Sequence, residues 1–301
     1  MTNVDIIHQK RGKIPPYKLI IYEKKGPIAY ITLNRPEKMN ALNQDILTEW
    51  EDACGDAKED EAIRVVVIKG AGRCFSSGYD VGSPGEGGTT VSPEIDQERY
   101  EGMHTHVDAY FRAIWDNPKI FIAQIHGFCL AGGGDMACFC DLKVVSDDAV
   151  FGYPAVRWGT MCTTFVWPYL LPMAKARELA YTGSFMNAQE AHLHGLVNKV
   201  VPREKLDEEV DILADAISKV PYMSVKFHKL IINRMYEMMG IRQGISWSAD
   251  LKLMVVNSTA AVEFRKLVQE KGLKSALESK DAKFATIDKS GAGLRARKYD
   301  R

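Results

Sequence analysis

The sequence predicts an α/β fold in which a mostly parallel sheet is covered by helices. Short β-branched apolar runs alternate with segments whose apolar residues recur at helical spacing, and this order builds parallel sheets. The chain of 301 residues is long enough to bury a large core. Its 46% apolar and 26% charged residues are ordinary usage for a globular protein.

The expected elements follow in chain order. Residues 17–23 and 28–33 are predicted to form two strands joined by a turn at Gly26, and helical spacing begins at Asn43. The β-branched run at 64–70 is typical of a strand covered on both faces. The later patterns predict a surface loop over 83–92, a helix carrying Met103, Val107, Tyr110, Phe111 and Ile114, a strand over 120–125, a helix over 132–140 and a strand over 142–146.

Four parts of the chain differ in composition. Residues 1–16 are polar and end in two prolines, so we expect an N-terminal arm. The α/β core should cover 17–200. Helical spacing prevails from Lys175 onward, and 201–287 should form a C-terminal helical region. Residues 288–301 are charged and contain glycine, which predicts a flexible tail.

Charge and cysteine usage argue against several classes of function. Lys plus Arg and Asp plus Glu are equal at 39 each, so no net field attracts nucleic acid or an anionic membrane. The first residues lack a secretory pattern, and no apolar run reaches about 18 residues, which predicts a cytoplasmic protein. The six cysteines lack zinc-type and redox-type spacing, so we expect buried thiols and no metal site.

Two glycine-centred turns are the strongest functional signal. Phe75–Asp80 and Leu130–Asp135 each follow an apolar, β-like run, and each has glycine where the chain should turn. Two such turns can aim two backbone N–H groups at one oxygen. Preorganised donors of this kind stabilise the negative charge of an enolate or a tetrahedral intermediate.

These turns belong to a series of motifs that identifies a family. The series resembles the crotonase (enoyl-CoA hydratase/isomerase) superfamily over roughly residues 17–284. The motifs that carry the resemblance are, in order, Asn34–Leu42 (NRPEKMNAL), Phe75–Asp80 (FSSGYD), Ile125–Asp141, Phe151-Gly152, and Thr182-Gly183 continuing through Ala188, Ala191 and Gly195–Asn198.

The resemblance implies a fold, an assembly and a substrate class. The fold consists of repeated ββα units forming two nearly perpendicular sheets, followed by a helical C-terminal region that supports homotrimers or homohexamers. The substrate is an acyl-CoA thioester. No cofactor is implied besides the coenzyme A that the substrate itself carries.

The resemblance also implies residue roles. The oxyanion-hole amides belong to Tyr79 and Gly132, and a helix beginning at Gly132 adds the positive end of its dipole. Gly133 should let the backbone approach the ligand closely. The residues expected to contact coenzyme A are Lys38, Met39, Ser77, Val81 and Lys280.

The sequence departs from the family's hydratases at the acid/base positions. Those enzymes hold a water between two glutamates, and here the two positions carry Asp135 and Ala155. Residues 161–164, where some relatives carry an acid, contain no strong base. Hydration with Asp135 as the sole acid/base, C–C bond hydrolysis of a β-keto or cyclic acyl-CoA or diketone, and isomerisation therefore stay open. So does a catalytically silent acyl-CoA-binding or structural subunit.

Other side chains remain candidates for chemistry or pocket walls. The aromatic rings of Tyr79, Tyr153 and Trp158 are expected around the substrate and favour a cyclic acyl group. We expect Asp80 and Asp141 to hold turns rather than act on substrate. The remaining polar candidates are Arg157, Cys162, His104 and His106, and His126 is expected to be hydrogen-bonded behind the site.

Overall fold

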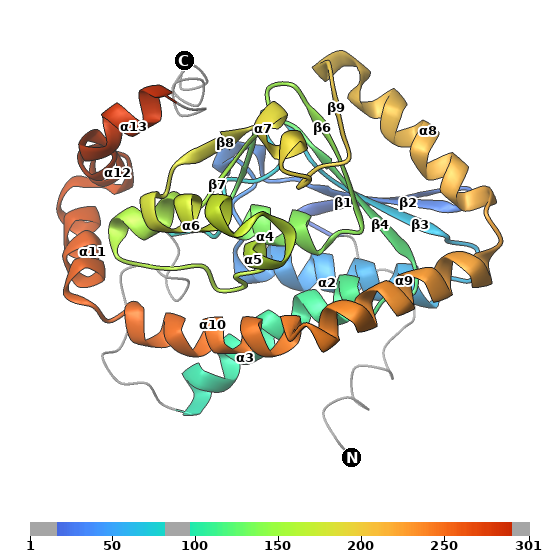
Figure 1. The fold of residues 1–301 in the computed structure, drawn as a ribbon, viewed down its shortest axis with the longest axis horizontal. Coiled ribbons are helices and arrows are strands. Elements are labelled where there is room, and N and C mark those ends of the chain that lie inside the picture. The colour runs from blue at the N-terminus through green and yellow to red at the C-terminus, as the bar shows by residue number, and fades with distance from the viewer. Residues whose placement is uncertain (1–16, 82–96, 291–301) are drawn as a thin grey trace.

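The computed structural model describes residues 17–81 and 97–290, and its strands form two sheets (Figure 1). The expected arm and the expected loop over 83–92 lie outside the described residues. The larger sheet has strand order β1-β2-β3-β4-β6-β9, and the smaller has β5-β7-β8. The strands are β1 (Ile20–Lys25), β2 (Ile28–Leu33), β3 (Val65–Gly70), β4 (Ile120–Ile125), β5 (Phe128–Leu130), β6 (Leu142–Ser146), β7 (Val150–Gly152), β8 (Phe185–Asn187) and β9 (Lys199–Val201).

The larger sheet is mostly parallel, as the alternating pattern predicts. Only β1 and β2 pair antiparallel within it, across a turn where Gly26 has φ +57°. The pairs β2–β3, β3–β4, β4–β6 and β6–β9 are all parallel. In the smaller sheet β5 and β7 are parallel, and β7 and β8 are antiparallel. The predicted α/β class and the two-sheet arrangement are confirmed.

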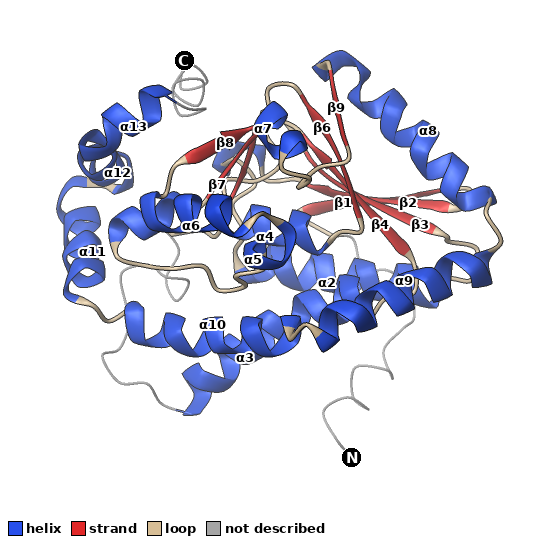
Figure 2. Ribbon diagram, in the orientation of Figure 1, coloured by secondary structure: helices blue, strands red, loops and turns tan. Residues whose placement is uncertain are grey.

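After the last strand, β9, the described chain is mostly helical (Figure 2). The helix expected from Asn43 begins there, because the Asn43 side chain accepts a hydrogen bond from Ile46 N at 3.1 Å. The helices are α2 (Gln44–Glu59), α3 (Gln97–Tyr110), α4 (Gly132–Phe139), α5 (Trp167–Leu170), α6 (Met173–Thr182), α7 (Ala188–Leu193), α8 (Leu206–Lys219), α9 (Tyr222–Met238), α10 (Ile241–Val255), α11 (Thr259–Lys271), α12 (Leu273–Asp281) and α13 (Ala285–Ser290), with short helical turns η1 (Pro36–Lys38), η2 (Phe111–Trp115), η3 (Pro154–Trp158), η4 (Arg203–Lys205) and η5 (Ala282–Phe284).

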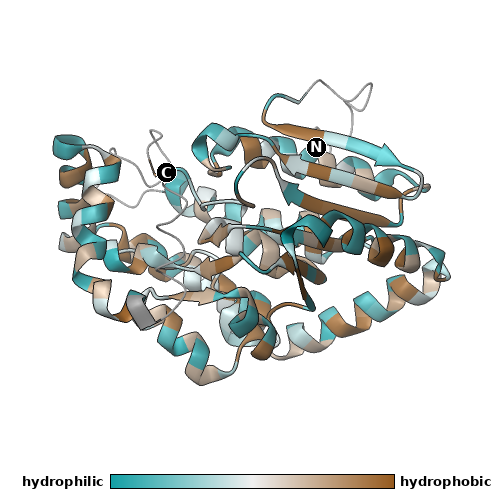
Figure 3. Cartoon of the chain, turned by 90° about the horizontal axis from the view of Figure 1, so that it is seen from above, coloured by the Kyte–Doolittle hydropathy of each residue, from teal (hydrophilic) through white to brown (hydrophobic). Residues whose placement is uncertain are grey.

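Different parts of the chain cover the two faces of the larger sheet. On β3, Val66 and Ile68 belong to the core cluster that includes Trp50 of α2 and Tyr110 of α3. Their neighbours Val65 and Val67 pack with α8 instead. Successive side chains of a strand point to opposite faces, so a β-branched run serves both cores. Figure 3 shows hydrophobic residues along these strands.

A buried lysine fastens the C-terminal helices to the sheet. Lys229 on α9 is 6% exposed, and its ammonium donates to the carbonyls of Ile114 and Lys119, each at 2.9 Å. It also contacts the Asp141 carboxylate at 2.8 Å, and that carboxylate accepts from Phe121 N at the start of β4. Asp141 therefore joins α9 to β4.

The last described helix extends past residue 287, where the sequence predicts the helical region to end. α13 continues to Ser290, and Asp288 within it accepts two hydrogen bonds from the Arg157 guanidinium, at 2.9 and 2.7 Å. Both side chains are buried. The prediction of a tail from 288 was wrong because this acid finds a partner 131 residues away, which local composition does not reveal. Residues 291–301 lie outside the described chain.

α9 and α10 present an exposed apolar surface. No helix of the described chain is long and apolar enough to span a bilayer. Apolar side chains are nevertheless exposed along both helices, including Met238, which is 90% exposed. We call this set the α9–α10 apolar surface: Met223, Phe227, Leu230, Ile231, Ile232, Met235, Met238, Trp247, Leu251 and Met254.

Candidate active site

The two glycine turns lie against each other. A β-bridge joins Ser76 to Cys129 of β5, so the first turn runs alongside the segment that leads into α4. Gly78 has φ +103°, and a Cβ there would lie 2.8 Å from Ala131 Cβ and 3.4 Å from Gly132 N. Glycine is needed at this position both for the backbone angle and for the close approach.

Two backbone N–H groups at this contact have no acceptor within the described residues. Those of Tyr79 and Gly132 are free, whereas the adjacent Asp80 N donates to Leu42 O and Ala131 N donates to Gly152 O, both at 2.9 Å. Gly132 is the first residue of α4, where backbone donors lack helical partners and the dipole is positive. These two donors can hold an oxyanion.

The expected coenzyme A segment lies beside the first turn. Met39 and Asn40 have positive φ values, both 52°, and Ser77 N donates to Met39 O at 3.0 Å. The buried Asn40 side chain donates to the carbonyls of Ala71 and Cys74, each at 2.9 Å. Lys38, which is exposed, and Met39 are thereby held next to Ser77. The role of Asn40 was missed, since a left-handed backbone at asparagine leaves no periodic signal.

Asp135 is a buried carboxyl in the first turn of α4. It is 1% exposed, and burial raises its pKa to about 7. The nearby hydroxyls of Thr164 and Tyr79 and the charge of Lys252 act in the opposite direction. Among the described residues, Oδ1 of Asp135 and Oγ1 of Thr164 have no hydrogen-bond partner of normal geometry. Buried polar atoms of this kind are available to a substrate or a water.

The Tyr79 side chain occupies the space next to the oxyanion hole. A Cβ at Gly132 would lie 2.6 Å from the Tyr79 ring. The Tyr79 hydroxyl is 3.4 Å from Asp135 Oδ2, 3.0 Å from His106 Nε2 and 3.1 Å from the Tyr110 hydroxyl. Burial holds the pKa of Tyr79 well above its usual range and lowers the pKa of His106 to about 4. Tyr79 and His106 are therefore neutral at pH 7.

Comparison with known proteins agrees with this geometry. The family model described as enoyl-CoA hydratase/isomerase matches residues 23–286.

The chain belongs to the enoyl-CoA hydratase/isomerase family.

Similar proteins include a crotonyl-CoA hydratase of Syntrophomonas wolfei, 31% identical over 272 residues that cover 89% of this chain and 98% of that protein. A short-chain-enoyl-CoA hydratase of Clostridium acetobutylicum is 34% identical, with coverage of 71% and 81%. A crystal structure of an enoyl-CoA hydratase/isomerase from Xanthobacter autotrophicus Py2 superposes with a TM-score of 0.81 at 31% identity, covering 89% of this chain and 98% of that one.

In this hydratase/isomerase family member, the buried carboxyl of Asp135 lies 3.4 Å from the Tyr79 hydroxyl. Ala155, which the resemblance predicts to stand where the hydratases carry their second glutamate, is buried in η3 and offers no acid. Residues 161–164 also supply none. Within the described chain, no three His, Cys, Asp or Glu side chains are grouped as a metal site would need.

Two of the polar candidates, Arg157 and His104, have structural contacts instead, and the third, Cys162, is a buried thiol. Arg157 is bound to Asp288, and His104 Nε2 lies 2.8 Å from Asp250 on α10. Burial raises the pKa of the Cys162 thiol well above its usual range, so the thiolate that a nucleophile needs is disfavoured.

The residues expected to hold turns or support the site do so. Asp80 forms an ion pair with Arg35 at 2.6 Å, and His126 Nε2 lies 3.0 Å from Gly72 O. Trp158 stacks on Phe264 of α11, with ring centroids 5.1 Å apart, so its ring packs between segments of the chain.

Gly133, Tyr153 and Lys280 differ in how they relate to the site. A Cβ at Gly133 would lie 2.6 Å from Ser76 Cβ, so this glycine makes room for Ser76 rather than for a ligand. Tyr153 is buried, and its hydroxyl donates a hydrogen bond to Met161 O at 3.1 Å. Burial and the charge of Asp135 both raise the pKa of Tyr153. Lys280 lies on α12, and no described contact joins it to the glycine turns.

Tyr110, Thr164 and Lys252 are site residues that sequence reasoning missed. Lys252 reaches from α10 to Met161 O at 2.8 Å and to Thr160, and burial lowers its pKa to about 8. A lone lysine among the apolar residues of a helix was the available signal. Tyr110 and Thr164 gave none, because their sequence spacing matches ordinary core positions.

Proposed function

We propose that this protein acts on an acyl-CoA thioester and stabilises the enolate of that thioester. The thioester oxygen would accept hydrogen bonds from the amides of Tyr79 and Gly132, which have no acceptor in the described chain. The coenzyme A portion would lie along Lys38, Met39, Ser77 and Val81. The observation that carries the proposal is a pair of free amides beside a buried carboxyl.

The reaction we favour is hydration of an enoyl-CoA, a lyase reaction, with Asp135 as the sole acid/base. The ionised carboxylate would take a proton from the water that attacks Cβ. The resulting acid would then give a proton to Cα of the enolate. A pKa of about 7 suits both roles at neutral pH. Coenzyme A enters as part of the substrate, and the proposal requires no other cofactor.

One observation favours a second reaction on the same site. Ala155 removes the carboxyl that would help to hold water over a double bond. C–C bond hydrolysis of a β-keto or cyclic acyl group needs the same enolate stabilisation. Asp135 would take a proton from the water that adds to the keto carbonyl, the C–C bond would break to give a carboxylic acid and the thioester enolate, and Asp135 would return the proton to Cα. Double-bond isomerisation would also use one acid/base. A silent acyl-CoA-binding subunit is the non-enzymatic alternative.

A panel of thioesters tests these proposals. The protein is assayed with crotonyl-CoA, cyclic enoyl-CoA and β-keto-CoA substrates, and coenzyme A binding is measured by calorimetry. We expect turnover of at least one class. We also expect Ala155→Glu to raise crotonyl-CoA hydration by about tenfold or more, because it restores the second carboxyl. Ala155→Gln, of the same size without the acid, is the control. An inert protein that binds no coenzyme A would contradict the proposal.

We further propose that the chain assembles as a homotrimer or homohexamer in the cytoplasm, through the α9–α10 apolar surface. Contiguous exposed apolar area of this kind marks an interaction site. Light scattering should give three or six times the chain mass of 33.7 kDa. Met238→Lys with Leu251→Lys should reduce this mass, whereas Ile212→Lys, an exposed position on α8, should not. A monomeric wild type contradicts the proposal.

A further inference from the structure

Four polar side chains form one hydrogen-bonded cluster around the Tyr79 hydroxyl. His106 and Tyr110 approach it from α3, and Asp135 approaches it from α4. The Tyr79 and His106 rings meet edge to face with centroids 5.1 Å apart. Tyr110 is fully buried and stacks on Phe139, which fixes the position of its hydroxyl. Tyr79 therefore joins Asp135 to His106.

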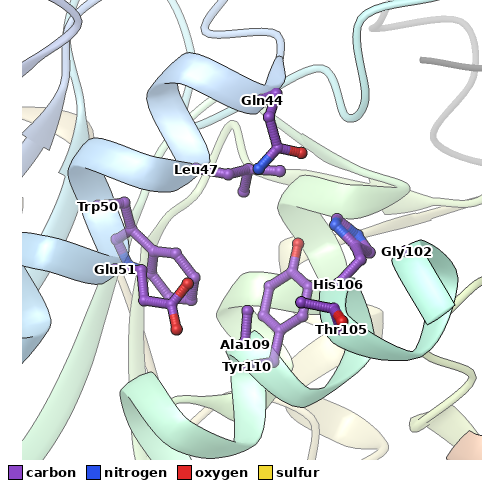
Figure 4. A pocket seen from close by; sticks show the side chains of 9 residues that line it. All are labelled: Gln44, Leu47, Trp50, Glu51, Gly102, Thr105, His106, Ala109 and Tyr110. Carbon is purple, nitrogen blue, oxygen red and sulfur yellow. The ribbon is translucent and has the colours of Figure 1, made fainter. Parts of the chain in front are cut away.

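His106 also borders a pocket that Asp135 does not reach. A pocket of about 260 Å³ lies between α2 and α3, lined by Gln44, Leu47, Trp50, Glu51, Gly102, Thr105, His106, Ala109 and Tyr110. Figure 4 shows the His106 ring and the Tyr110 hydroxyl at the space between the two helices. Asp135, 1% exposed, is not part of its wall. The pocket is large enough to hold water.

The cluster has two complete hydrogen-bonding arrangements. The Tyr79 oxygen can accept two hydrogen bonds and donate one. With Asp135 protonated, Asp135 and Tyr110 donate to Tyr79, and Tyr79 donates to Nε2 of a His106 that is protonated at Nδ1. With Asp135 ionised, Tyr79 donates to Asp135, while Tyr110 and the Nε2–H tautomer of His106 donate to Tyr79. Each arrangement satisfies the Tyr79 hydroxyl.

We propose that Tyr79 and His106 form a proton relay between Asp135 and the pocket between α2 and α3. To reprotonate Asp135, the Tyr79 O–H proton moves to Asp135 Oδ2 and the His106 Nε2 proton moves to the Tyr79 oxygen. His106 Nδ1, which has no partner within the described chain, takes one proton from the pocket water and buffer. One proton enters and one reaches Asp135, so the step balances without a cofactor. His106 remains neutral throughout.

The surrounding groups agree with a neutral relay. The titratable groups that interact with Asp135 are Tyr79, Tyr110, Tyr153, Cys129, Cys138, Cys162 and Lys252. Lys252 is the cationic group among them, and its charge disfavours a protonated His106 as well as a protonated Asp135. A neutral imidazole can accept a proton at one nitrogen while it releases one from the other. Tyr79 and His106 are thus positioning residues that act through Asp135, and this role rests on the proposed function.

Infrared spectroscopy of the substrate-free protein tests the relay. The C=O band of protonated Asp135, identified by its loss in Asp135→Asn, is followed after mixing into ²H₂O. We expect the deuteration rate to fall at least tenfold in Tyr79→Phe and in His106→Gln. Tyr110→Phe, which keeps the path through His106, should stay within about twofold of wild type.

Each outcome supports or contradicts the relay, whether or not the protein turns over a thioester. Wild-type exchange rates in both Tyr79→Phe and His106→Gln would overturn the relay. Slowing in Tyr110→Phe but not in His106→Gln would place the path through Tyr110 and also overturn it. Because no substrate is present, an enzyme inert toward every thioester leaves this result intact. Unchanged amide bands in the same spectra show that each variant is folded.

Discussion

Asp135→Asn is expected to lower kcat by about 10²–10⁴-fold on any thioester that the protein turns over. Asparagine keeps the shape of the side chain but cannot take up or release the proton that moves between water and Cα. The neighbouring residues offer no replacement carboxyl, since Ala155 and the segment 161–164 supply none. Initial rates with the best substrate of the panel measure the effect.

A matched substitution shows whether the fall in kcat is specific to the carboxylate of Asp135 or follows from the loss of any carboxylate. Asp108 is exposed on α3, and Asp108→Asn should leave kcat within about twofold of wild type. Coenzyme A affinity should be similar in both variants, because the expected nucleotide contacts lie on another segment. An Asp135→Asn enzyme that retains most of its activity would show that the acid/base lies elsewhere.

Asp135→Asn should also be more stable than the wild-type protein at high pH. Burial raises the pKa of Asp135 from 3.8 to about 7, so the unfolded carboxyl ionises at lower pH than the folded one. Wild-type stability therefore falls as the pH rises between these values, by roughly 4 kcal/mol in total. Asparagine lacks this penalty. Urea unfolding should show a stability gain about 3 kcal/mol larger at pH 8 than at pH 5, and a gain independent of pH would contradict the raised pKa.

The positions of strands and helices could be predicted to the extent that they rest on local patterns. The β-branched run of β3 and the cap at Asn43 act within a few residues, and the structure places both elements where the pattern does. The three-residue strands β8 and β9 follow Lys175, where helices prevail, and are too short for a periodic signal. The burial of Asp288 depends on a partner that no local window contains.

The site shows the same division between local and distant causes. Glycine at a turn is a local requirement, so the two turns could be predicted from sequence, whereas Tyr79 and Gly132 as the two donors are what the resemblance to the family implies. The environment of Asp135 is assembled from separate elements, with Tyr110 from α3, Thr164 from a loop and Lys252 from α10. The spacing of these residues along the chain does not show that they come together, and the raised pKa of Asp135 follows from its burial among these distant segments.

Gly78→Ala should lower kcat/KM by about 10²–10³-fold, the cost of misplacing one oxyanion donor. The new Cβ would lie 2.8 Å from Ala131 Cβ and 2.9 Å from Leu130 O, at a backbone φ of +103° that alanine disfavours. Relief of this clash requires the first turn to move away from β5 and α4. Since the next residue is Tyr79, that movement separates its amide from the amide of Gly132.

Gly26→Ala is the control for backbone strain alone. Gly26 also has a positive φ, +57°, but nothing lies within 4 Å of its would-be Cβ. Alanine there should cost about 1 kcal/mol of stability and leave kcat/KM unchanged. Steady-state kinetics and thermal unfolding of both variants compare the two effects. If Gly78→Ala keeps full activity while losing only stability, the meeting of the two turns is structural, and the oxyanion is held by other donors.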